Sequence, residues 1–497
     1  MVRLAATSLS AVLYAWAFPP DAHRELAWVA LVPLLLAVRG ASVGRAFALG
    51  GLWSVASAYV LNDWFPRAVS SYFHGSPGVS ALLFLGVSTL TAGLEYGAFA
   101  VWHRGTVHIS TAVRPLVVAA GWVAADLGRV TFLGGDPWAL LGYSQVGLLP
   151  LAQIAEVGGV HAISFVVVAA NVALAEMCRF RATWSGAVTA ATLTGIVLCF
   201  GFYRLHTIDL TAGPPIPVSI VQGNLDVGSQ WREEFYGLNL RQYLDLTAKV
   251  VRQSGSLVVW PESAMTFFLD GEPAYQRAIG STLAGVEADL IAGGPRVLPG
   301  SDRYFNSAFL IDATGRVRAH YDKQLLIPCA EFFPLRIDIL RRSFGRVREF
   351  TPGELSTLLP TRAGAAGVLI CNEAFFPGPA AEHVRKGAQF LVNIANDSWL
   401  RDRKFSEPAF DMVTLRAIEQ RRWMIRASTA GPSGIIDPLG RVVARTRWGT
   451  ADTLRGTFRS REGLTTYATV GDMFAIACCI VAALVWCRAP ASHDGTL

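Results

Sequence analysis

Long apolar segments fill the first two hundred residues and constrain the possible folds more than any other feature of the sequence. A helix that crosses a bilayer needs about 20 consecutive apolar residues. Segments of this kind lie at about residues 4–18, 26–38, 46–62, 80–102, 115–128, 150–177, 183–203 and 470–487. We count the short first two as separate spans rather than as a re-entrant pair. The pattern therefore predicts an α-helical transmembrane bundle of about eight spans, seven of them before residue 206.

The part of the chain between the seventh and eighth apolar segments is polar and turn-rich. Its short apolar strands alternate with helical patterns at 233–252 and 405–422, and the strands lie at 216–221, 257–260, 367–370, 390–394 and 434–436. Strands that alternate with helices indicate a layered α/β domain. The predicted divisions are the bundle at 1–206, the α/β domain at 207–465, a closing span at 466–489 and a polar tail at 490–497.

The arginines in the short loops predict how the chain is oriented in the membrane. With the amino terminus in the cytoplasm, eight arginines fall inside and three outside, which agrees with the positive-inside rule. The inside set is Arg3, Arg39, Arg45, Arg104, Arg114, Arg179, Arg181 and Arg488, and the outside set is Arg24, Arg67 and Arg129. Both termini are then cytoplasmic, and the α/β domain lies on the extracytoplasmic side.

Charge and cysteine usage exclude several classes of function. The net charge of +6 is spread through loops, without a run of Lys and Arg interleaved with aromatic residues, so nucleic-acid binding is not expected. The seven cysteines contain no C-x-x-C pair, so no metal site is predicted. None of the nine histidines lies within ten residues of Cys371, which disfavours a Cys–His nucleophile of the papain type.

Three reactive side chains each follow a predicted buried strand, and together they form a chemically sensible set. They are Glu262, Lys323 and Cys371. A thiol needs a base to become a nucleophilic thiolate, and a buried carboxylate has its pKa raised enough to accept that proton. An ammonium group stabilises the oxyanion that forms when sulfur attacks a carbonyl. The set predicts covalent acyl chemistry with Cys371 as the nucleophile.

In their order along the chain, these residues resemble the catalytic residues of the nitrilase superfamily. The stretches that carry the resemblance are Trp260-Pro261-Glu262, Tyr321-Asp322-Lys323 and Ile370-Cys371-Asn372-Glu373. The span layout is similar to the membrane branch of that superfamily, the bacterial apolipoprotein N-acyltransferases. Further similar motifs are 221–224 with Trp231, 323–334, 396–399 and 136–145, so the resemblance covers nearly the whole chain. Cys329-Ala330, Asn372 and Leu400 depart from the residues usual in the family.

The resemblance implies a fold, a reaction and partners. The α/β domain is expected to be a nitrilase-like αββα sandwich. A fatty acyl group is expected to move from a phospholipid, through a thioester on Cys371, to the α-amino group of a diacylglyceryl-cysteine on an apolipoprotein. No cofactor is expected, and the chain is expected to be a monomer in the bacterial cytoplasmic membrane. The alternatives are a membrane-tethered amidohydrolase and an inactive membrane scaffold.

Several other residues have both a functional and a structural interpretation. Glu331 either orients Lys323 or is an ordinary loop carboxylate, and Glu373 either supports the site or is solvated. Trp231 either lines an acyl-chain pocket or packs in the core. Asn224 belongs to the opening motif that the resemblance identifies. Glu95 and Asp126, which lie in or near spans, either line the interior of the bundle or lie at the water interface.

Overall fold

The computed structural model describes residues 1–72, 76–178, 184–226, 231–251, 257–328, 330–332 and 349–488. Cys329 and the predicted tail at 490–497 lie outside the described residues. The chain forms two units. Unit 1 contains Met1–Pro66, Pro77–Leu205 and the chain from Val470 onward, and unit 2 contains Arg67–Ser76 and His206–Thr469. The observed division at residue 206 lies one residue from the predicted one.

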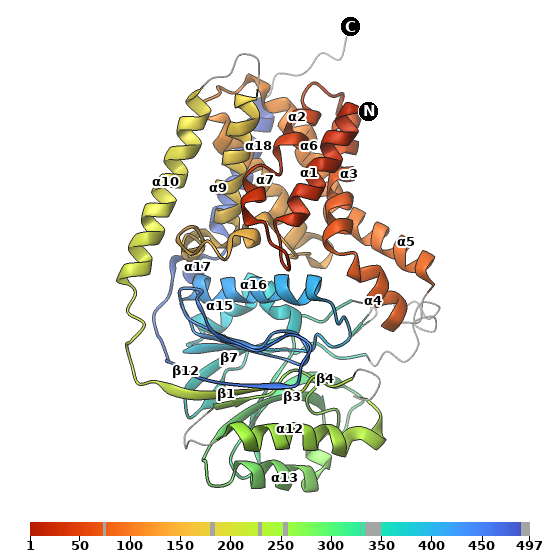
Figure 1. Cartoon of the computed structure of the whole chain (residues 1–497), viewed down its shortest axis with the longest axis vertical. Coiled ribbons are helices and arrows are strands. Elements are labelled where there is room, and N and C mark those ends of the chain that lie inside the picture. The colour runs from red at the N-terminus through yellow and green to blue at the C-terminus, as the bar shows by residue number, and fades with distance from the viewer. Residues whose placement is uncertain are drawn as a thin grey trace. The chain divides into compact units, whose positions relative to one another are not determined.

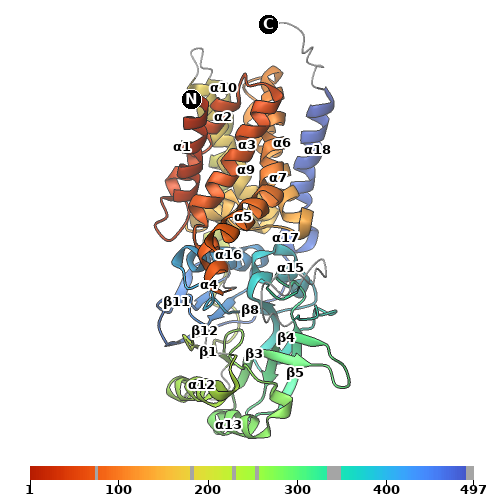
Figure 2. The same cartoon turned by 90° about the vertical axis from the view of Figure 1, so that its right-hand side faces the viewer.

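Unit 1 is helical throughout its long elements, and these helices run alongside one another in Figures 1 and 2. Its α-helices are α1 (Val2–Trp16), α2 (Val32–Val38), α3 (Val43–Leu61), α5 (Pro77–Ser88), α6 (Leu94–Gly105), α7 (Arg114–Thr131), α8 (Leu149–Ala152), α9 (Ala155–Met177), α10 (Trp184–Thr207) and α18 (Met473–Arg488). Short 3-10 turns at Arg24–Trp28 and Thr106–His108 and a π-helical turn at Thr89–Gly93 extend some of them. The last two residues of α10 belong to unit 2, and two more helices, α4 (Trp64–Tyr72) and α17 (Thr466–Val470), also cross the divisions between the units.

Among the residues that the structure describes, three helical stretches are long and apolar enough to cross a membrane. They are Pro77–His108, Ala155–Met177 and Trp184–Thr207, while Val2–Trp16 and Met473–Arg488 are apolar but shorter. The second predicted span, 26–38, consists of a 3-10 turn and the seven-residue helix α2. At 1.5 Å per residue α2 is about 11 Å long, which is less than the hydrocarbon thickness. The total of about eight spans therefore stays a prediction.

The closing helix α18 returns to the bundle, although more than 260 residues separate it from α10. Ala475 and Cys478 of α18 pack with Ala120 and Val123 of α7 in one apolar cluster. The indole nitrogen of Trp102 also donates a hydrogen bond of 3.0 Å to the carbonyl of Ala482. An apolar cluster and a hydrogen bond to a backbone carbonyl thus join α18 to α6 and α7 within unit 1.

Unit 2 is built on two six-stranded sheets. The order of the first is β12-β1-β2-β3-β4-β5, and that of the second is β11-β10-β9-β8-β7-β6. The first sheet contains β1 (Ile216–Gln222), β2 (Leu257–Val259), β3 (Asp289–Val297), β4 (Tyr304–Ile311), β5 (Val317–Asp322) and β12 (Asp452–Phe458). The second contains β6 (Leu359–Thr361), β7 (Gly364–Ile370), β8 (Phe390–Ala395), β9 (Met424–Ser428), β10 (Gly434–Ile436) and β11 (Val442–Arg445).

The two sheets face each other across a common apolar core, with helices on the outer faces. Residues of both sheets, such as Val259 and Ile370, belong to one buried cluster. A second cluster packs α12 (Tyr236–Val250) and α13 (Pro273–Leu283) on the first sheet, as Figure 2 shows. The second sheet is covered by α15 (Pro377–Arg385) and α16 (Arg403–Gln420), and the Asp402 side chain caps α16 by accepting from the Lys404 amide. These layers form the predicted αββα sandwich.

The strand directions bring five loops to one region of the sandwich. In the first sheet β1, β2 and β3 are parallel. The strand β4 is antiparallel to β3, and β5 is antiparallel to β4, so β5 runs in the same direction as β1, β2 and β3. In the second sheet β7, β8 and β9 are parallel. The carboxyl ends of parallel strands meet at one edge of a sheet, where α/β proteins form their binding sites. The loops after β1, β2, β5, β7 and β8 carry most of the predicted site residues.

Candidate active site

Glu262, Lys323 and Cys371 come together at the strand ends. Glu262 lies three residues after β2, and Lys323 and Cys371 directly follow β5 and β7. The Lys323 Nζ atom is 3.6 Å from Glu262 Oε1, and the Cys371 thiol is near enough to both groups for their charges to shift its pKa. All three are buried, with 1% of Lys323 and 6% of Cys371 exposed. The prediction that each follows a buried strand is wrong for Lys323, because β5 is an edge strand whose residues alternate between partly buried and exposed.

Cys371 occupies a sharp turn from strand to helix. Its φ angle is 52°, in the left-handed region that residues other than glycine rarely adopt. The turn leads directly into the 3-10 helix Cys371–Phe375. Unusual backbone angles of this kind persist only where the surrounding structure enforces them, and they cluster at functional sites. Here the turn directs the thiol to the carboxylate and the ammonium group, instead of continuing the line of β7.

Lys323 lies between two carboxylates. Its Nζ atom is 2.9 Å from the Glu331 carboxylate in addition to its ion pair with Glu262. Glu331 is itself held by the Ile327 amide, which donates to its Oε2 atom at 2.7 Å. Glu331 is therefore a buried partner of Lys323 and is not a solvated loop residue.

The electrostatic balance keeps the thiol protonated at rest. Burial, together with the negative charge of Glu262, raises the pKa of Cys371 well above its ordinary value. Burial also raises the pKa of Glu262, although Lys323 and the hydrogen bonds partly oppose the shift. For Lys323, burial lowers the pKa, but the carboxylates of Glu331 and Glu262 outweigh it and the net shift is upward. The site thus holds a neutral thiol, an ammonium group and a carboxylate that is more basic than usual.

Glu373 forms hydrogen bonds both to the turn at Cys371 and to the residues around Lys323. Its Oε2 atom accepts from the Ile370 amide at 2.7 Å, just before Cys371. Its Oε1 atom accepts from the Tyr321 hydroxyl at 2.9 Å and the Gln324 amide at 2.7 Å, on either side of Lys323. The side chain is fully buried, which excludes the solvated interpretation, and burial raises the pKa of Glu373 to about 7. Glu373 supports the geometry without occupying the place between thiol and ammonium.

Asn224 and Trp231 lie farther from the reacting groups. The Asn224 backbone N–H donates to the carbonyl of Thr429 at 2.7 Å, its side-chain amide donates to the carbonyl of Gly449 at 3.0 Å, and the Thr429 hydroxyl donates to the carbonyl of Glu262 at 3.3 Å. Asn224 therefore supports the Glu262 loop through one intermediate residue. Trp231 is 38% exposed, so it does not pack in the core, and its proposed contact with an acyl chain stays a prediction. Asn372, one of the departures from the family pattern, donates to the carbonyl of Leu325 at 3.1 Å.

Sequence reasoning missed Asn306, which lies at the centre of the charge cluster. Its amide group donates both to Glu262 Oε1 at 2.7 Å and to Glu331 Oε1 at 2.9 Å. Asn306 lies inside the apolar strand β4, where asparagine is disfavoured, and that misfit was the available sign. The backbone N–H of Asn396, which donates to Glu262 Oε2 at 2.8 Å, was missed as well, although its motif was noted.

Gly293 is a third missed residue, and the site needs it because it has no side chain. It lies on β3 beside the Glu262 turn, and a Cβ atom there would lie 2.6 Å from Glu262 Cα. The Gly293 amide also donates to the carbonyl of Pro261 at 3.2 Å. Only glycine allows β3 to approach the backbone of Glu262 so closely.

Comparison with known proteins identifies the family. A model of the apolipoprotein N-acyltransferase N-terminal domain matches residues 10–173, and the carbon-nitrogen hydrolase model matches residues 218–462. The apolipoprotein N-acyltransferase of Geobacter metallireducens is 33% identical over 98% of this chain and 96% of its own length. The chain belongs to the apolipoprotein N-acyltransferase family. A Pseudomonas aeruginosa relative of the same name is 31% identical over 94% of this chain and 91% of its own length.

Solved structures of the nitrilase superfamily cover about half of this N-acyltransferase family member. An amidase from Nesterenkonia covers 54% of the chain and 98% of its own length, at 17% identity and a TM-score of 0.41. Nit3 from Saccharomyces cerevisiae covers 51% of the chain and 92% of its own length, at 18% identity and a TM-score of 0.38. The carbon-nitrogen hydrolase match and the two-sheet architecture confirm the predicted nitrilase-like domain.

Proposed function

We propose that the chain transfers a fatty acyl group from a membrane phospholipid to the α-amino group of the diacylglyceryl-cysteine at the start of an apolipoprotein. The observation that carries the proposal is the buried cluster of Cys371, Glu262 and Lys323 in a chain whose relatives are named for N-acyl transfer to apolipoproteins. A thiol, a base and an ammonium group supply the nucleophile, the proton acceptor and the oxyanion partner that acyl transfer requires.

In the first half-reaction the thiol becomes acylated. Glu262 takes the proton of Cys371 as the sulfur attacks the ester carbonyl of the phospholipid. The ammonium group of Lys323 stabilises the oxyanion of the tetrahedral intermediate, where a single well-placed donor contributes about 10²–10³-fold in rate. Glu262 then returns the proton to the departing alkoxide, so that a lysophospholipid leaves and an acyl thioester remains.

In the second half-reaction the acyl group passes to nitrogen. The amine of the acceptor cysteine attacks the thioester carbonyl, and Glu262 accepts the proton that the amine loses. The carbon–sulfur bond breaks, and the proton on Glu262 returns the thiolate to the thiol. A carboxylate that is more basic than an ordinary glutamate suits this repeated transfer, because within each half-reaction it holds the proton between the attack and the departure of the leaving group.

The proposed location follows from the substrates and from the helices of unit 1. Three of these helices are long and apolar enough to span a bilayer. Both substrates carry acyl chains, so a membrane-embedded enzyme encounters them at high local concentration. We place the chain in the bacterial cytoplasmic membrane as a monomer, with unit 2 on the extracytoplasmic side and both termini in the cytoplasm.

Intact-mass analysis of the purified full-length protein tests the proposal. Incubation with phospholipid should add the mass of one acyl chain, and the adduct should disappear when a diacylglyceryl peptide is supplied. Cys371→Ala should abolish the adduct, whereas Cys178→Ala, which alters an exposed cysteine, should leave it unchanged. Hydrolysis of a small amide without an acyl adduct would instead support an amidohydrolase and sink the transferase proposal.

A further inference from the structure

A row of side chains crosses three parallel strands of the second sheet. The register pairs Leu369 of β7 with Asn393 of β8, and Asn393 with Arg426 of β9. Their neighbours along the strands, such as Val392 and Ile425, belong to the apolar core between the sheets. Because successive side chains of a strand point to opposite faces, Asn393 and Arg426 point toward the helix-covered face of the sheet. Both are buried there, so a polar pair lies inside an otherwise apolar layer.

Arg426 contacts two side chains at once with its guanidinium group. It donates to Asp397 Oδ2 at 2.9 Å, to the side-chain oxygen of Asn393 and, through Nε, to the carbonyl of Pro432 at 3.3 Å. The Asp397 side chain is buried as well, so both charges of this ion pair are removed from water. Such a pair is favourable only when its geometry is well matched. Because the guanidinium is a rigid planar fork, it also fixes how far apart its two partners lie.

The first of these contacts leads to the turn at Cys371. The side-chain amide nitrogen of Asn393 donates to the carbonyl of Leu369 at 2.9 Å and to the carbonyl of Cys371 at 3.3 Å. These carbonyls lie just before and just after the end of β7, where Cys371 adopts its φ of 52°. A backbone conformation of this kind persists only where neighbouring contacts enforce it. By binding the side-chain oxygen of Asn393, Arg426 keeps the nitrogen directed at the two carbonyls.

The second contact leads to the carboxylate of Glu262. Asp397 directly follows Asn396, whose backbone N–H donates to Glu262 Oε2 at 2.8 Å. Asp397 also accepts from the Ser428 hydroxyl at 2.9 Å, so two side chains of β9 hold the loop that follows β8. The position of the Asn396 N–H, and with it the orientation of the Glu262 carboxylate, therefore depends on how firmly Asp397 is held.

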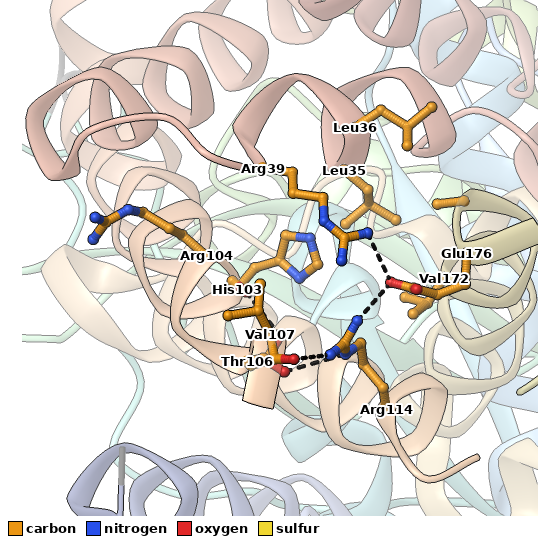
Figure 3. A pocket seen from close by; sticks show the side chains of 11 residues that line it. Leu35, Leu36, Arg39, His103, Arg104, Thr106, Val107, Arg114, Val172 and Glu176 are labelled. Carbon is orange, nitrogen blue, oxygen red and sulfur yellow. Dashed lines mark hydrogen bonds and ion pairs between the residues drawn. The ribbon is translucent and has the colours of Figure 1, made fainter. Parts of the chain in front are cut away.

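A buried arginine of unit 1 provides a contrast. Arg114 of α7 donates to Glu176 Oε1 at 2.8 Å, to the carbonyl of Thr106 at 3.1 Å and to the carbonyl of Ile109 at 2.9 Å. Figure 3 shows its guanidinium group directed toward the Glu176 carboxylate. These contacts join the ends of helices, which is a stabilising role. The partners of Arg426 instead lead to the two groups between which the thiol proton is proposed to move.

We propose that Arg426 is a positioning residue for acyl transfer. Through Asn393 it holds the turn at Cys371, and through Asp397 it holds the loop whose backbone binds the carboxylate of Glu262. The inference rests on the proposed function, because that function makes Cys371 the nucleophile and Glu262 its base. Since Arg426 acts through other side chains, it affects the rate of the chemical step and leaves the affinity for phospholipid unchanged.

Alkylation of Cys371 by iodoacetamide in the purified full-length protein tests the inference without requiring acyl transfer. Arg426→Met should slow this alkylation, followed by peptide mass, at least about tenfold, because small displacements of reacting groups are costly. Acyl-adduct formation at saturating phospholipid should slow by a similar factor. The phospholipid concentration that gives half of the maximal rate should change by less than about twofold, a division that a general loss of structure would not produce.

Arg422 offers a matched control in the same unit. It is 2% exposed and donates to the carbonyls of Ala388 and Gly463, each at 2.8 Å. It precedes β9, and Ala388 precedes β8, so these contacts lie at the end of the strands opposite the site. Arg422→Met should lower the temperature of thermal unfolding, as Arg426→Met does, while both rates change by less than about twofold.

Three results would overturn the assignment. They are equal slowing in the two arginine variants, unchanged alkylation in Arg426→Met, and a higher half-saturating concentration with an unchanged maximal rate. If Arg426→Met does not fold, Asn393→Leu keeps the ion pair of Arg426 with Asp397 and should still slow alkylation about fivefold, which corresponds to one lost hydrogen bond. Unchanged alkylation in that variant would be equally damaging. Failure of the unsubstituted protein to form an acyl adduct would count against the proposed function alone, because the alkylation comparison does not depend on it.

Discussion

In the proposed mechanism, the buried charges around Cys371 explain how a thiol with a high pKa would react. Two carboxylates and one ammonium group surround it, so a free thiolate is unfavourable in the resting site. When the thiol proton moves to Glu262, the carboxylate loses its negative charge and the sulfur gains one, so the total charge of the site is unchanged. As electron density then moves from sulfur to the carbonyl oxygen, Lys323 stabilises the new charge. Reaction is therefore coupled to the arrival of an electrophile.

The raised pKa of Glu262 predicts an acid limb in the pH profile of acyl-adduct formation. Glu262 accepts a proton only when it is ionised, so the rate should fall as pH drops through its pKa. Because burial raises that pKa, half of the maximal rate should occur above pH 4.3, the usual value for glutamate. Pre-steady-state formation of the acyl adduct across pH measures this, and an acid limb centred at or below the usual value would contradict the assignment.

Lys323 is expected to matter for both stability and catalysis. Lys323→Met leaves Glu262 and Glu331 buried without a counter-charge, which should lower the free energy of unfolding by about 3–5 kcal/mol. Acyl-adduct formation should slow by about 10²–10³-fold, because the oxyanion loses its partner. Thermal unfolding and intact mass measure the two effects.

A second variant separates these two roles of Lys323. Lys323→Met combined with Glu331→Gln removes one charge of each sign, so stability should recover by more than half while activity stays low. Recovery of activity in the double variant would show that Lys323 serves only to neutralise Glu331.

At the scale of elements, the close approach of β3 to the Glu262 turn predicts a sensitive position. Gly293→Ala would place a Cβ atom 2.6 Å from Glu262 Cα and 2.8 Å from the Pro261 carbonyl oxygen, and both are backbone atoms. The turn must shift, so acyl-adduct formation should slow at least about tenfold, since small misplacements of catalytic groups are costly. Gly271→Ala has open space around it and should be neutral. Equal activity of the two variants would show that the turn is tolerant.

The five predicted strands, which correspond to β1, β2, β7, β8 and β10, were predictable because their residues combine apolar runs with turn residues at the ends, whereas strands such as β3, β4 and β9 were not predicted. The predicted strand at 216–221 is β1, Ile216–Gln222, and the predicted helix at 233–252 contains α12 after a 3-10 turn. The internal structure of segment 26–38 was not predictable, because hydropathy reports an apolar environment and does not distinguish a 3-10 turn from an α-helix. The role of Asn306 was not predictable from local sequence, because its partners Glu262 and Glu331 lie 44 and 25 residues away along the chain.

For the whole molecule, the arginine asymmetry and the odd number of predicted spans before unit 2 lead to a specific orientation. Arg39, Arg104 and Arg114 gather at the end of unit 1 from which α10 runs toward unit 2. Short loops that are rich in Lys and Arg stay on the cytoplasmic side of the membrane. The predicted odd number of crossings before residue 206 would then place unit 2 outside. This proposed orientation would give Cys371, the proposed nucleophile, access to lipoproteins after export.

Thiol labelling in spheroplasts tests this orientation, in a background where every cysteine except Cys371 is replaced by alanine. Asp302→Cys places an exposed thiol in unit 2, and Ser42→Cys places one in unit 1 at the start of α3, near the arginines. A membrane-impermeant maleimide should label Asp302→Cys in intact spheroplasts and Ser42→Cys only after permeabilisation. Labelling in the reverse order would place the acyl chemistry in the cytoplasm, where an exported lipoprotein could not reach it, so the same measurement bears on both the orientation and the proposed acceptor.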